Sequence, residues 1–433
     1  MKYDIVVLGL GVTGYATAAY CSQAGLKVAI TDNRARPPLA ERLRQNYPGI
    51  ELTVAEYDYE VLKQAKRVVI SPGINPNDPV VKWLNENNKE VISDIDLFLE
   101  KYQGKIIAIT GSNGKSTTVK MLNDLINISG KKACMIGNIG KPVLQFLMEE
   151  AGESCDWVII EVSSFQLHWT KTMRADIGVI LNIYPNHLDW HSSYYDYKKA
   201  KISLLENSTQ GVMPLALKEL IENTPTVDRI KEWIPSYSCL NESSLAIESR
   251  VIDALPYALH KSAIATCIIA KLMNIETYHC CRALEEFQPW PFRCQHESSS
   301  YGVWYNDAKS SNLAAARYAI ESVSRRHGSQ VIWIAGGVTK NEEFSEVARW
   351  ARKFISQAVV YGQDRELFLN ALIGVCPVSP VGTLDEAMKL VKRTMKKTDI
   401  IVYSPAAASF DQFENFQHRG QFFSEQLLGL LPV

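Results

Sequence analysis

The sequence lacks any apolar run long enough to span a bilayer, and its first strand-like segment, Tyr3 to Leu8, leads straight into a glycine turn. That opening lacks the long apolar region and small-residue cleavage site of a secretory signal. The charges lack a predominant sign, since 46 lysines and arginines balance 47 aspartates and glutamates. Such a balance provides no general field that would attract nucleic acid or anionic membrane. We therefore expect a cytoplasmic protein that binds neither, and whose anionic ligands require local sites.

Paired cysteine motifs are also missing. The nine cysteines are scattered without a C-x-x-C pair, and the adjacent Cys280 and Cys281 lie in a segment with a helical pattern. Neither a metal site nor a disulfide framework is indicated. We expect reduced, buried thiols, as in ordinary cytosolic proteins.

The length of 433 residues exceeds one hydrophobic core of ordinary size and predicts several domains. Short β-rich runs alternate with helical stretches from Tyr3 to about Ser93, again from Lys105, and again from Val303. Each alternation predicts a parallel sheet covered by helices, hence an α/β fold. The segment from about Gly211 to Leu255 has weak periodicity, which suggests short or missing strands there.

A glycine-rich turn follows the first strand, where Gly9, Gly11 and Gly14 complete a G-x-G-x-x-G pattern. Asp32 ends the next strand, about where a ribose-binding carboxylate is expected. Alone, this pattern predicts a nicotinamide or flavin enzyme, but a second phosphate loop begins a new α/β unit soon afterwards. We therefore interpret the turn as a site for one nucleoside diphosphate, with its pyrophosphate at the amino end of the following helix. Glycines that serve only a tight turn are the alternative.

The second turn, GSNGKST from Gly111 to Thr117, lies between the strand pattern IIAIT and a helical pattern. In this setting backbone N–H groups surround phosphate oxygens, Lys115 reaches the terminal phosphates and Ser116 binds Mg²⁺. The loop departs from the general pattern because Ile109 stands where the first glycine is expected. Glu161, at the end of DWVIIE, would complete a metal site. A solvent-exposed glutamate at a strand edge is the alternative.

Further motifs make the chain resemble the Mur ligase family. The central motifs are GNIG at Gly137 to Gly140, EVSSFQL at Glu161, NHLDWH at Asn186 and YKKAK ending at Lys201. The C-terminal motifs are WYNDAKSSN around Asp307, GG at Gly336 and SPAAASFDQFENFQHRG from Ser404 to Gly420. The last motif is characteristic of the member that adds D-glutamate. The DNPR signature of the meso-diaminopimelate-adding member is absent.

The resemblance implies three domains: a Rossmann-like UDP-sugar-binding domain over residues 1–93, a central P-loop ATPase-type domain over 94–289, and a Rossmann-like amino-acid-binding domain over 290–433. It implies an ATP-dependent ligase, with two Mg²⁺ ions, that adds D-glutamate to UDP-N-acetylmuramoyl-L-alanine in peptidoglycan precursor synthesis. The substrate carboxylate would attack ATP to give an acyl phosphate, which the amine of D-glutamate displaces. We expect a monomer whose partners are these small molecules.

The same resemblance assigns roles to single residues. Catalytic roles fall on Lys115, His187, Lys201 and Lys309, with Lys201 carbamylated, and the metal ligands are Ser116, Glu161, His187 and Lys201. The UDP-sugar is assigned to Gly11, Val12, Thr13, Gly14, Asp32, Arg34, Gly73 and Asn138. ATP is assigned to Gly111, Ser112, Asn113, Gly114, Lys115, Ser116, Thr117, Arg293 and Asp307. D-glutamate is assigned to Ser311, Lys340, Ser409 and Phe416.

Several residues have plainer interpretations. Lys201 could be a solvated helix lysine and His187 a structural histidine. Core packing is the preferred interpretation for four aromatic residues: Trp304, Tyr305, Trp333 and Phe413. One departure from the family concerns HKSAI, because Ile264 replaces an asparagine that reads adenine, which leaves base recognition open.

Three rival functions stay open on the sequence: another ATP-dependent amino-acid ligase, a catalytically impaired UDP-sugar-binding protein, and an oxidoreductase. The N-terminal glycine turn argues against a folylpolyglutamate synthase. The presence of Lys115, Glu161 and Lys201 argues against an impaired protein. The oxidoreductase rests on the glycine fingerprint alone.

Overall fold

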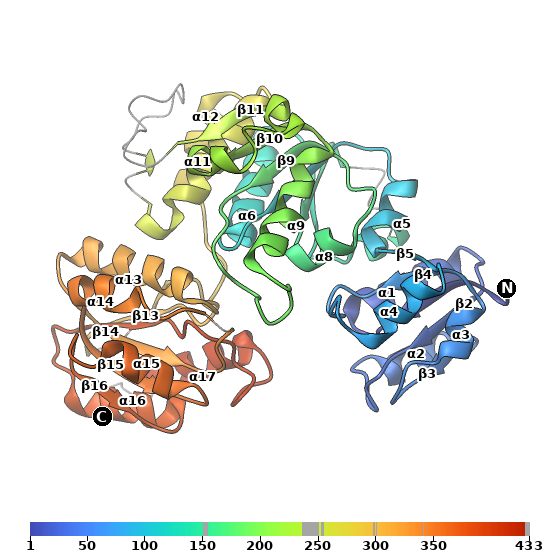
Figure 1. The fold of residues 1–433 in the computed structure, drawn as a ribbon. Coiled ribbons are helices and arrows are strands. Elements are labelled where there is room, and N and C mark those ends of the chain that lie inside the picture. The colour runs from blue at the N-terminus through green and yellow to red at the C-terminus, as the bar shows by residue number, and fades with distance from the viewer. Residues whose placement is uncertain are drawn as a thin grey trace. The chain divides into compact units, whose positions relative to one another are not determined.

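The computed structural model describes residues 1–149, 155–235, 251–252, 255–297, 299, 301–340 and 342–428. Its contacts divide the chain into two compact units. The first comprises Met1–Ile183, Trp190–Ile247 and Ser262–Leu284, and the second Tyr184–Asp189, Glu248–Lys261 and Glu285–Val433. Three separate sheets, each with its own helices, confirm the predicted α/β class (Figure 1). Within the described ranges no helix is both long and apolar enough to span a membrane.

The first sheet contains five parallel strands in the order β3-β2-β1-β4-β5. This order changes direction between β1 and β4, and ligands of such sheets bind where the order reverses. The glycine turn follows β1 directly and therefore lies at this point. The strands are β1 (Tyr3–Leu8), β2 (Val28–Thr31), β3 (Glu51–Thr53), β4 (Ala65–Ile70) and β5 (Glu90–Ile92). The helices are α1 (Val12–Gln23), α2 (Ala40–Asn46), α3 (Tyr59–Lys63), α4 (Pro79–Glu86) and α5 (Asp94–Lys101).

The second sheet contains six parallel strands in the order β11-β10-β9-β6-β8-β7. Both central strands, β6 and β9, are apolar and buried, as expected of a parallel sheet covered on both faces. The strands are β6 (Ile106–Thr110), β7 (Ala133–Gly137), β8 (Trp157–Glu161), β9 (Ala175–Ile180), β10 (Ser208–Pro214) and β11 (Ile230–Ile234). The helices are α6 (Lys115–Ile128), α7 (Val143–Met148), α8 (Ser164–Trp169), α9 (Tyr194–Glu206), α11 (Tyr257–Leu272) and α12 (Thr277–Glu285).

The expectation of short or missing strands after Gly211 is met by a short strand in the described part of that segment. It contains the end of β10, the 3-10 helices Leu215–Leu220 and Pro225–Arg229, and strand β11. Strand β11 lies at the sheet edge, and its sequence IKEWI mixes charged and apolar residues. An edge strand needs no continuous apolar run, which explains the weak pattern. Residues 236–250 and 253–254 of the segment lie outside the described residues.

The third sheet contains six strands in the order β12-β13-β17-β14-β15-β16, of which only the edge pair β12–β13 is antiparallel. Apolar clusters cover both faces, and they include Trp304, Tyr305 and Trp333 with Phe413 at the margin. The core interpretation of these aromatics is confirmed. The strands are β12 (Gln295–Glu297), β13 (Val303–Asn306), β14 (Val331–Gly336), β15 (Ile355–Tyr361), β16 (Val378–Pro380) and β17 (Ile400–Tyr403). The helices are α13 (Leu313–His327), α14 (Val347–Phe354), α15 (Arg365–Leu372), α16 (Leu384–Thr394) and α17 (Phe416–Leu428).

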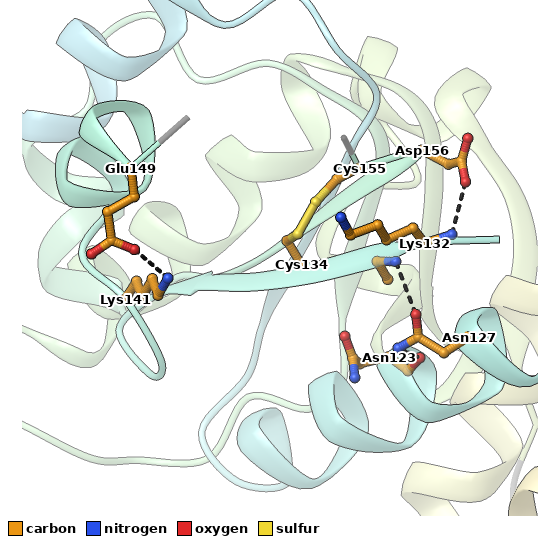
Figure 2. Close-up of a disulfide and its surroundings, with 9 residues drawn as sticks. Asn123, Asn127, Lys132, Cys134, Lys141, Glu149, Cys155 and Asp156 are labelled. Carbon is orange, nitrogen blue, oxygen red and sulfur yellow. Dashed lines mark hydrogen bonds and ion pairs between the residues drawn. A yellow bond between two sulfur atoms is a disulfide. The ribbon is translucent and has the colours of Figure 1, made fainter. Parts of the chain in front are cut away.

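One pair of cysteines departs from the expected reduced state. Cys134 on β7 and Cys155, two residues before β8, form a disulfide with Cα atoms 6.2 Å apart (Figure 2). Strands β7 and β8 pair in parallel with Ala133 opposite Trp157, which brings the two cysteines together. This register does not follow from the sequence spacing. The other described cysteines are thiols, Cys280 and Cys281 lie on α12 as predicted, and Cys239 lies outside the described residues.

Candidate functional site

The turn after β6 has the geometry of a phosphate loop. Gly114 caps α6 with a φ of 84°, a left-handed conformation that favours glycine. The Lys115 ammonium donates to the carbonyl oxygens of Gly111 at 2.7 Å and Ser112 at 3.3 Å, so it lies over the loop. Ser116 is buried in the first turn of the helix. A lysine and the amino end of a helix together form an anion site.

Two residues that the sequence analysis did not single out support this loop. Asn182, just after β9, accepts from the backbone N–H of Asn113 and donates to its carbonyl oxygen, both at 2.9 Å. On α9, the Tyr197 hydroxyl lies 2.6 Å from the Ser112 hydroxyl. Both supports come from other elements of the sheet, so no local spacing signalled them.

Glu161 provides a buried carboxylate at the same sheet edge as the loop. It is the last residue of β8, pairs in register with Ile109 of β6, and is 2% exposed. Its Oε1 accepts from the side-chain amide of Asn138 at 2.7 Å, whereas its buried Oε2 has no hydrogen-bond partner in the described chain. The interpretation as a solvent-exposed glutamate was therefore wrong. A buried carboxylate oxygen that has no hydrogen-bond partner suits a hard cation such as Mg²⁺.

Protein side chains alone do not complete a metal site at Glu161. Among the described residues, no group of three or more His, Cys, Asp and Glu side chains could hold a metal ion. An ion at Glu161 would thus need hydroxyl, phosphate or water oxygens as its other ligands. Mg²⁺ normally keeps waters and substrate phosphates in this way, so the arrangement suits it.

Lys201 lies against the phosphate loop and not in solvent. It is 1% exposed on α9, and its ammonium donates to the Thr110 hydroxyl at 3.2 Å and the Gly111 carbonyl at 3.1 Å. Burial, reinforced by the nearby positive charge of Lys115, lowers the pKa of the Lys201 amine well below its ordinary value, although Glu161 opposes this. The interpretation as a solvated helix lysine was wrong.

The two histidines of NHLDWH have different surroundings. His187, with a φ of 57°, belongs to the segment Tyr184–Asp189 of the second compact unit, and its place beside a metal stays a prediction. His191 is buried, with Nε2 2.9 Å from the Ser164 hydroxyl and its ring centroid 5.2 Å from that of Tyr197. Burial lowers the pKa of His191 to about 4, so its imidazole is neutral at pH 7.

The first glycine turn combines tight packing with open space. A Cβ on Gly14 would lie 2.0 Å from the Gly9 carbonyl oxygen, so no larger residue fits without a backbone shift. A Cβ on Gly11 would meet no atom within 4 Å, and the neighbouring Val12 and Thr13 are exposed and half-buried. Gly14 therefore allows α1 to pack against the turn. Gly11 leaves room for a phosphate at the amino end of α1.

Asp32 is buried and both of its oxygens are engaged. The backbone N–H of Leu10 donates to Oδ2 at 2.6 Å, and the backbone N–H of Arg34 donates to Oδ1 at 2.8 Å. The Arg34 guanidinium also donates to Oδ2, at 2.6 Å. Burial opposes ionisation, but hydrogen bonds from Arg34 and Leu10 hold the pKa of Asp32 below its usual value. Asp32 tethers the turn and orients Arg34, whose side chain is 48% exposed; their nucleotide contacts stay a prediction.

Two further residues predicted for the UDP-sugar, Gly73 and Asn138, lie on loops tied to the central motifs. The Trp190 indole N–H donates to the Gly73 carbonyl at 3.2 Å, and the ring of Phe165 stacks on Trp190 with centroids 4.3 Å apart. The backbone N–H of Asn138 donates to the Glu161 carbonyl at 2.9 Å, beside the side-chain contact of the same two residues. Asn138 is thus fixed directly at the carboxylate.

In the second unit, three of the residues predicted for D-glutamate form two contacts, one of them with Lys309, which was predicted as a catalytic residue. The Lys340 ammonium donates to the Ser311 hydroxyl at 3.2 Å. The Lys309 ammonium lies 4.0 Å from the ring centroid of Phe416, within the range of a cation–π contact. Ser409 is buried in the loop after β17.

Asp307, predicted to contact ATP, is buried after β13. It accepts from the Ser404 hydroxyl at 2.6 Å and from the backbone N–H of Cys294 at 3.0 Å. Burial raises the pKa of Asp307 to about 7, against these hydrogen bonds and the positive charge of Arg293. Its carboxyl group therefore takes up a proton more readily than that of an ordinary aspartate.

Ile264 is unsuited to read a base, because its side chain is both apolar and buried. It lies on α11 and is 1% exposed. Its side chain therefore packs in the core. The residue that reads the base is unassigned among those described.

Three successive parts of the chain match known protein domains. The chain matches Mur ligase MurD-like, N-terminal domain, over residues 3–93, Mur ligase middle domain over 109–235, and Mur ligase, glutamate ligase domain, over 292–407. Relatives named UDP-N-acetylmuramoylalanine--D-glutamate ligase are 29% identical: that of Coxiella burnetii (strain RSA 331 / Henzerling II) over 98% of both chains, and that of Legionella pneumophila (strain Paris) over 98% of this chain and 99% of the relative.

Solved structures with the same fold are more distant. UDP-N-acetylmuramate-alanine ligase MurC from Thermotoga maritima has a TM-score of 0.59 at 13% identity and covers 99% of both chains. MurF ligase from Thermotoga maritima in complex with ADP has a TM-score of 0.59 at 11% identity and covers 99% of this chain and 96% of that one. At these identities the likeness shows the fold alone.

The two glycines of the first turn allow a matched test. Gly14→Ala should destabilise the protein by about 1–3 kcal/mol, because its Cβ forces the backbone at Gly9 to move. Gly11→Ala should cost only about 0.5–1 kcal/mol, because alanine is a poorer N-cap than glycine, yet weaken UDP binding, because its Cβ occupies the space for the phosphate. Chemical denaturation and titration calorimetry with UDP measure the two effects. Undiminished UDP binding by Gly11→Ala would contradict this division of roles.

Proposed function

The chain belongs to the Mur ligase family, and from that premise we propose that it uses ATP to join D-glutamate to UDP-N-acetylmuramoyl-L-alanine. The observation that carries the proposal is the grouping of the partly buried Lys115 with the buried Glu161 and Lys201 around one phosphate loop. The name shared by relatives over nearly the whole chain supports the choice of substrates. We further propose that the protein acts as a monomer in the cytoplasm, on small molecules alone.

The chemistry explains the choice of residues. A carboxylate oxygen of the substrate attacks the γ-phosphorus of ATP, the bond to ADP breaks, and an acyl phosphate forms. The amine of D-glutamate then attacks the acyl carbon and phosphate leaves. Negative charges meet in the first step, so positioning and charge neutralisation are the main requirements. Lys115 suits the terminal phosphates, and Ser116 and Glu161 suit a Mg²⁺ ion, which neutralises phosphate charge when bound.

Lys201 has a distinct part in this proposal. A positive ammonium has no favourable place beside a metal ion, whereas a carbamate formed on its amine with CO₂ supplies carboxylate-like oxygens. Carbamate formation needs the neutral amine, which the buried position at Thr110 and Gly111 favours. The carbamate would help to hold a second Mg²⁺ ion, with His187 beside it.

Amino-acid selection is proposed to reside in the second unit. Lys340 with Ser311, and Lys309 with Phe416, offer two cationic points at the loops of the third sheet. D-glutamate carries two carboxylates, so two cations suit it. Ser409 adds a hydroxyl donor in a buried loop.

Phosphate release from ATP tests the function. With UDP-N-acetylmuramoyl-L-alanine present, D-glutamate should exceed D-glutamine and D-alanine in kcat/KM by at least about 100-fold, because a site with buried charge partners rejects analogues that lack the charge. Lys340→Met should narrow the preference over D-glutamine. L-glutamate serves as the stereochemical control. Equal turnover of D-glutamine and D-glutamate by the unaltered protein would sink the assignment.

Replacement of Lys201 tests the carbamate. Lys201→Ala should nearly abolish ligation and leave UDP-substrate binding within about threefold, because the phosphate loop and the first glycine turn follow strands of different sheets. A short-chain carboxylic acid should restore part of the rate, and bicarbonate should activate the unaltered protein. Lys199→Ala, on the exposed face of the same helix, is the matched control and should stay active. Unchanged activity in Lys201→Ala would refute the role.

A further inference from the structure

Arg419 is a buried charge that none of the proposed roles uses. It lies on α17, is 1% exposed and is among the largest fully buried side chains. Its Nε and Nη1 are buried and lack a hydrogen bond of good geometry among the described residues, although its positive charge acts on the Asp307 carboxyl and on the hydroxyls of Tyr361 and Tyr403. Burial of a guanidinium with unpaired donors costs free energy. Stability alone therefore gives a weak reason for an arginine at this position.

The paired nitrogen of Arg419 connects two loops. Nη2 donates to the carbonyl of Ala308 at 3.0 Å and to the carbonyl of Ala407 at 2.9 Å. Ala308 follows strand β13 and Ala407 follows strand β17, which pair in parallel. The two loops therefore leave the same edge of the third sheet. A single nitrogen fixes the distance between them.

These loops carry residues proposed to bind the amino acid. Lys309 adjoins Ala308, and Ser409 lies two residues beyond Ala407. Phe416, whose ring contacts the Lys309 ammonium, lies one helical turn before Arg419 on α17. Residues three apart in a helix share a face. The first turn of α17 thus contacts the same region through an aromatic ring and a guanidinium.

A third loop packs closely against the same guanidinium. Val338 and Ala408 exchange two backbone hydrogen bonds, of 3.0 and 2.7 Å. A Cβ on Gly337 would lie 2.2 Å from the Ala408 carbonyl oxygen and 3.2 Å from Nη1 of Arg419. This loop leads to Lys340. The loops that carry Lys309, Lys340 and Ser409 therefore converge on Arg419.

We propose that Arg419 is a positioning residue of the amino-acid site. Its guanidinium holds the loops after β13 and β17 at the separation that lets Lys309, Lys340 and Ser409 bind the two carboxylates of D-glutamate together. The inference rests on the proposed function. Arg419 itself is buried and does not touch the amino acid.

Kinetics of Arg419→Met and Arg419→Lys test the proposal. Arg419→Met should raise the KM for D-glutamate by about tenfold or more, because small displacements of binding groups are costly, and leave the KM for the UDP-substrate unchanged. Arg419→Lys, which can still donate to a carbonyl, should recover part of the loss. Arg365→Met is the matched control, since Arg365 is partly exposed and donates to the Gly362 carbonyl. An unchanged KM for D-glutamate in Arg419→Met would overturn the proposal.

A second measurement separates this proposal from the function and from misfolding. Amide hydrogen exchange in residues 307–311 and 404–411 should be faster in both Arg419 variants than in the unaltered protein, while exchange in the first sheet stays the same. Unchanged exchange in both loops would overturn the proposal that Arg419 holds them in place. If the unaltered protein released no phosphate with D-glutamate, the proposed function would fail, and exchange alone would decide the role of Arg419. If Arg419→Met failed to fold, with Arg419→Lys folded and unchanged in KM, the residue would be structural only.

Discussion

The contact of the buried Lys201 amine with the phosphate loop is the interaction on which the central site depends. Burial without water disfavours the charged form of a primary amine, so a lysine at this position needs hydrogen-bond acceptors. Thr110 and Gly111 supply the acceptors. The Glu161 carboxylate, whose Oε2 has no hydrogen-bond partner in the described chain, lies at the same sheet edge, so the lysine is close to the group proposed to bind Mg²⁺.

Local motifs on strand–turn–helix units were predictable from the sequence. Lys115 and Glu161 each follow or end an apolar strand, and parallel strands present their carboxyl ends at one edge. The structure places both at that edge. Gly14 was also predictable, because its close approach to Gly9 is a backbone requirement that only glycine meets. In each case the geometry is set by residues that lie close together in the sequence, so the local pattern is enough to predict it.

Features that depend on strand order or register were not predictable. Asn182 and Tyr197 reach the phosphate loop only because β9 lies beside β6 and α9 packs against them. The disulfide between Cys134 and Cys155 requires the register of β7 with β8. The hydrogen bonds of Arg419 to Ala308 and Ala407 join loops that follow two strands distant in sequence. Such contacts have no fixed spacing, so a single sequence carries no signal for them.

Transfer of an oxygen atom tests the central claim most directly, namely that the phosphate loop promotes attack of the substrate carboxylate on ATP. UDP-N-acetylmuramoyl-L-alanine labelled with oxygen-18 in its alanyl carboxylate would be ligated to D-glutamate, and the released phosphate analysed by mass spectrometry. Each released phosphate should carry one labelled oxygen, because the acyl phosphate breaks at its carbon–oxygen bond. Unlabelled phosphate released together with the ligated product would contradict the claim.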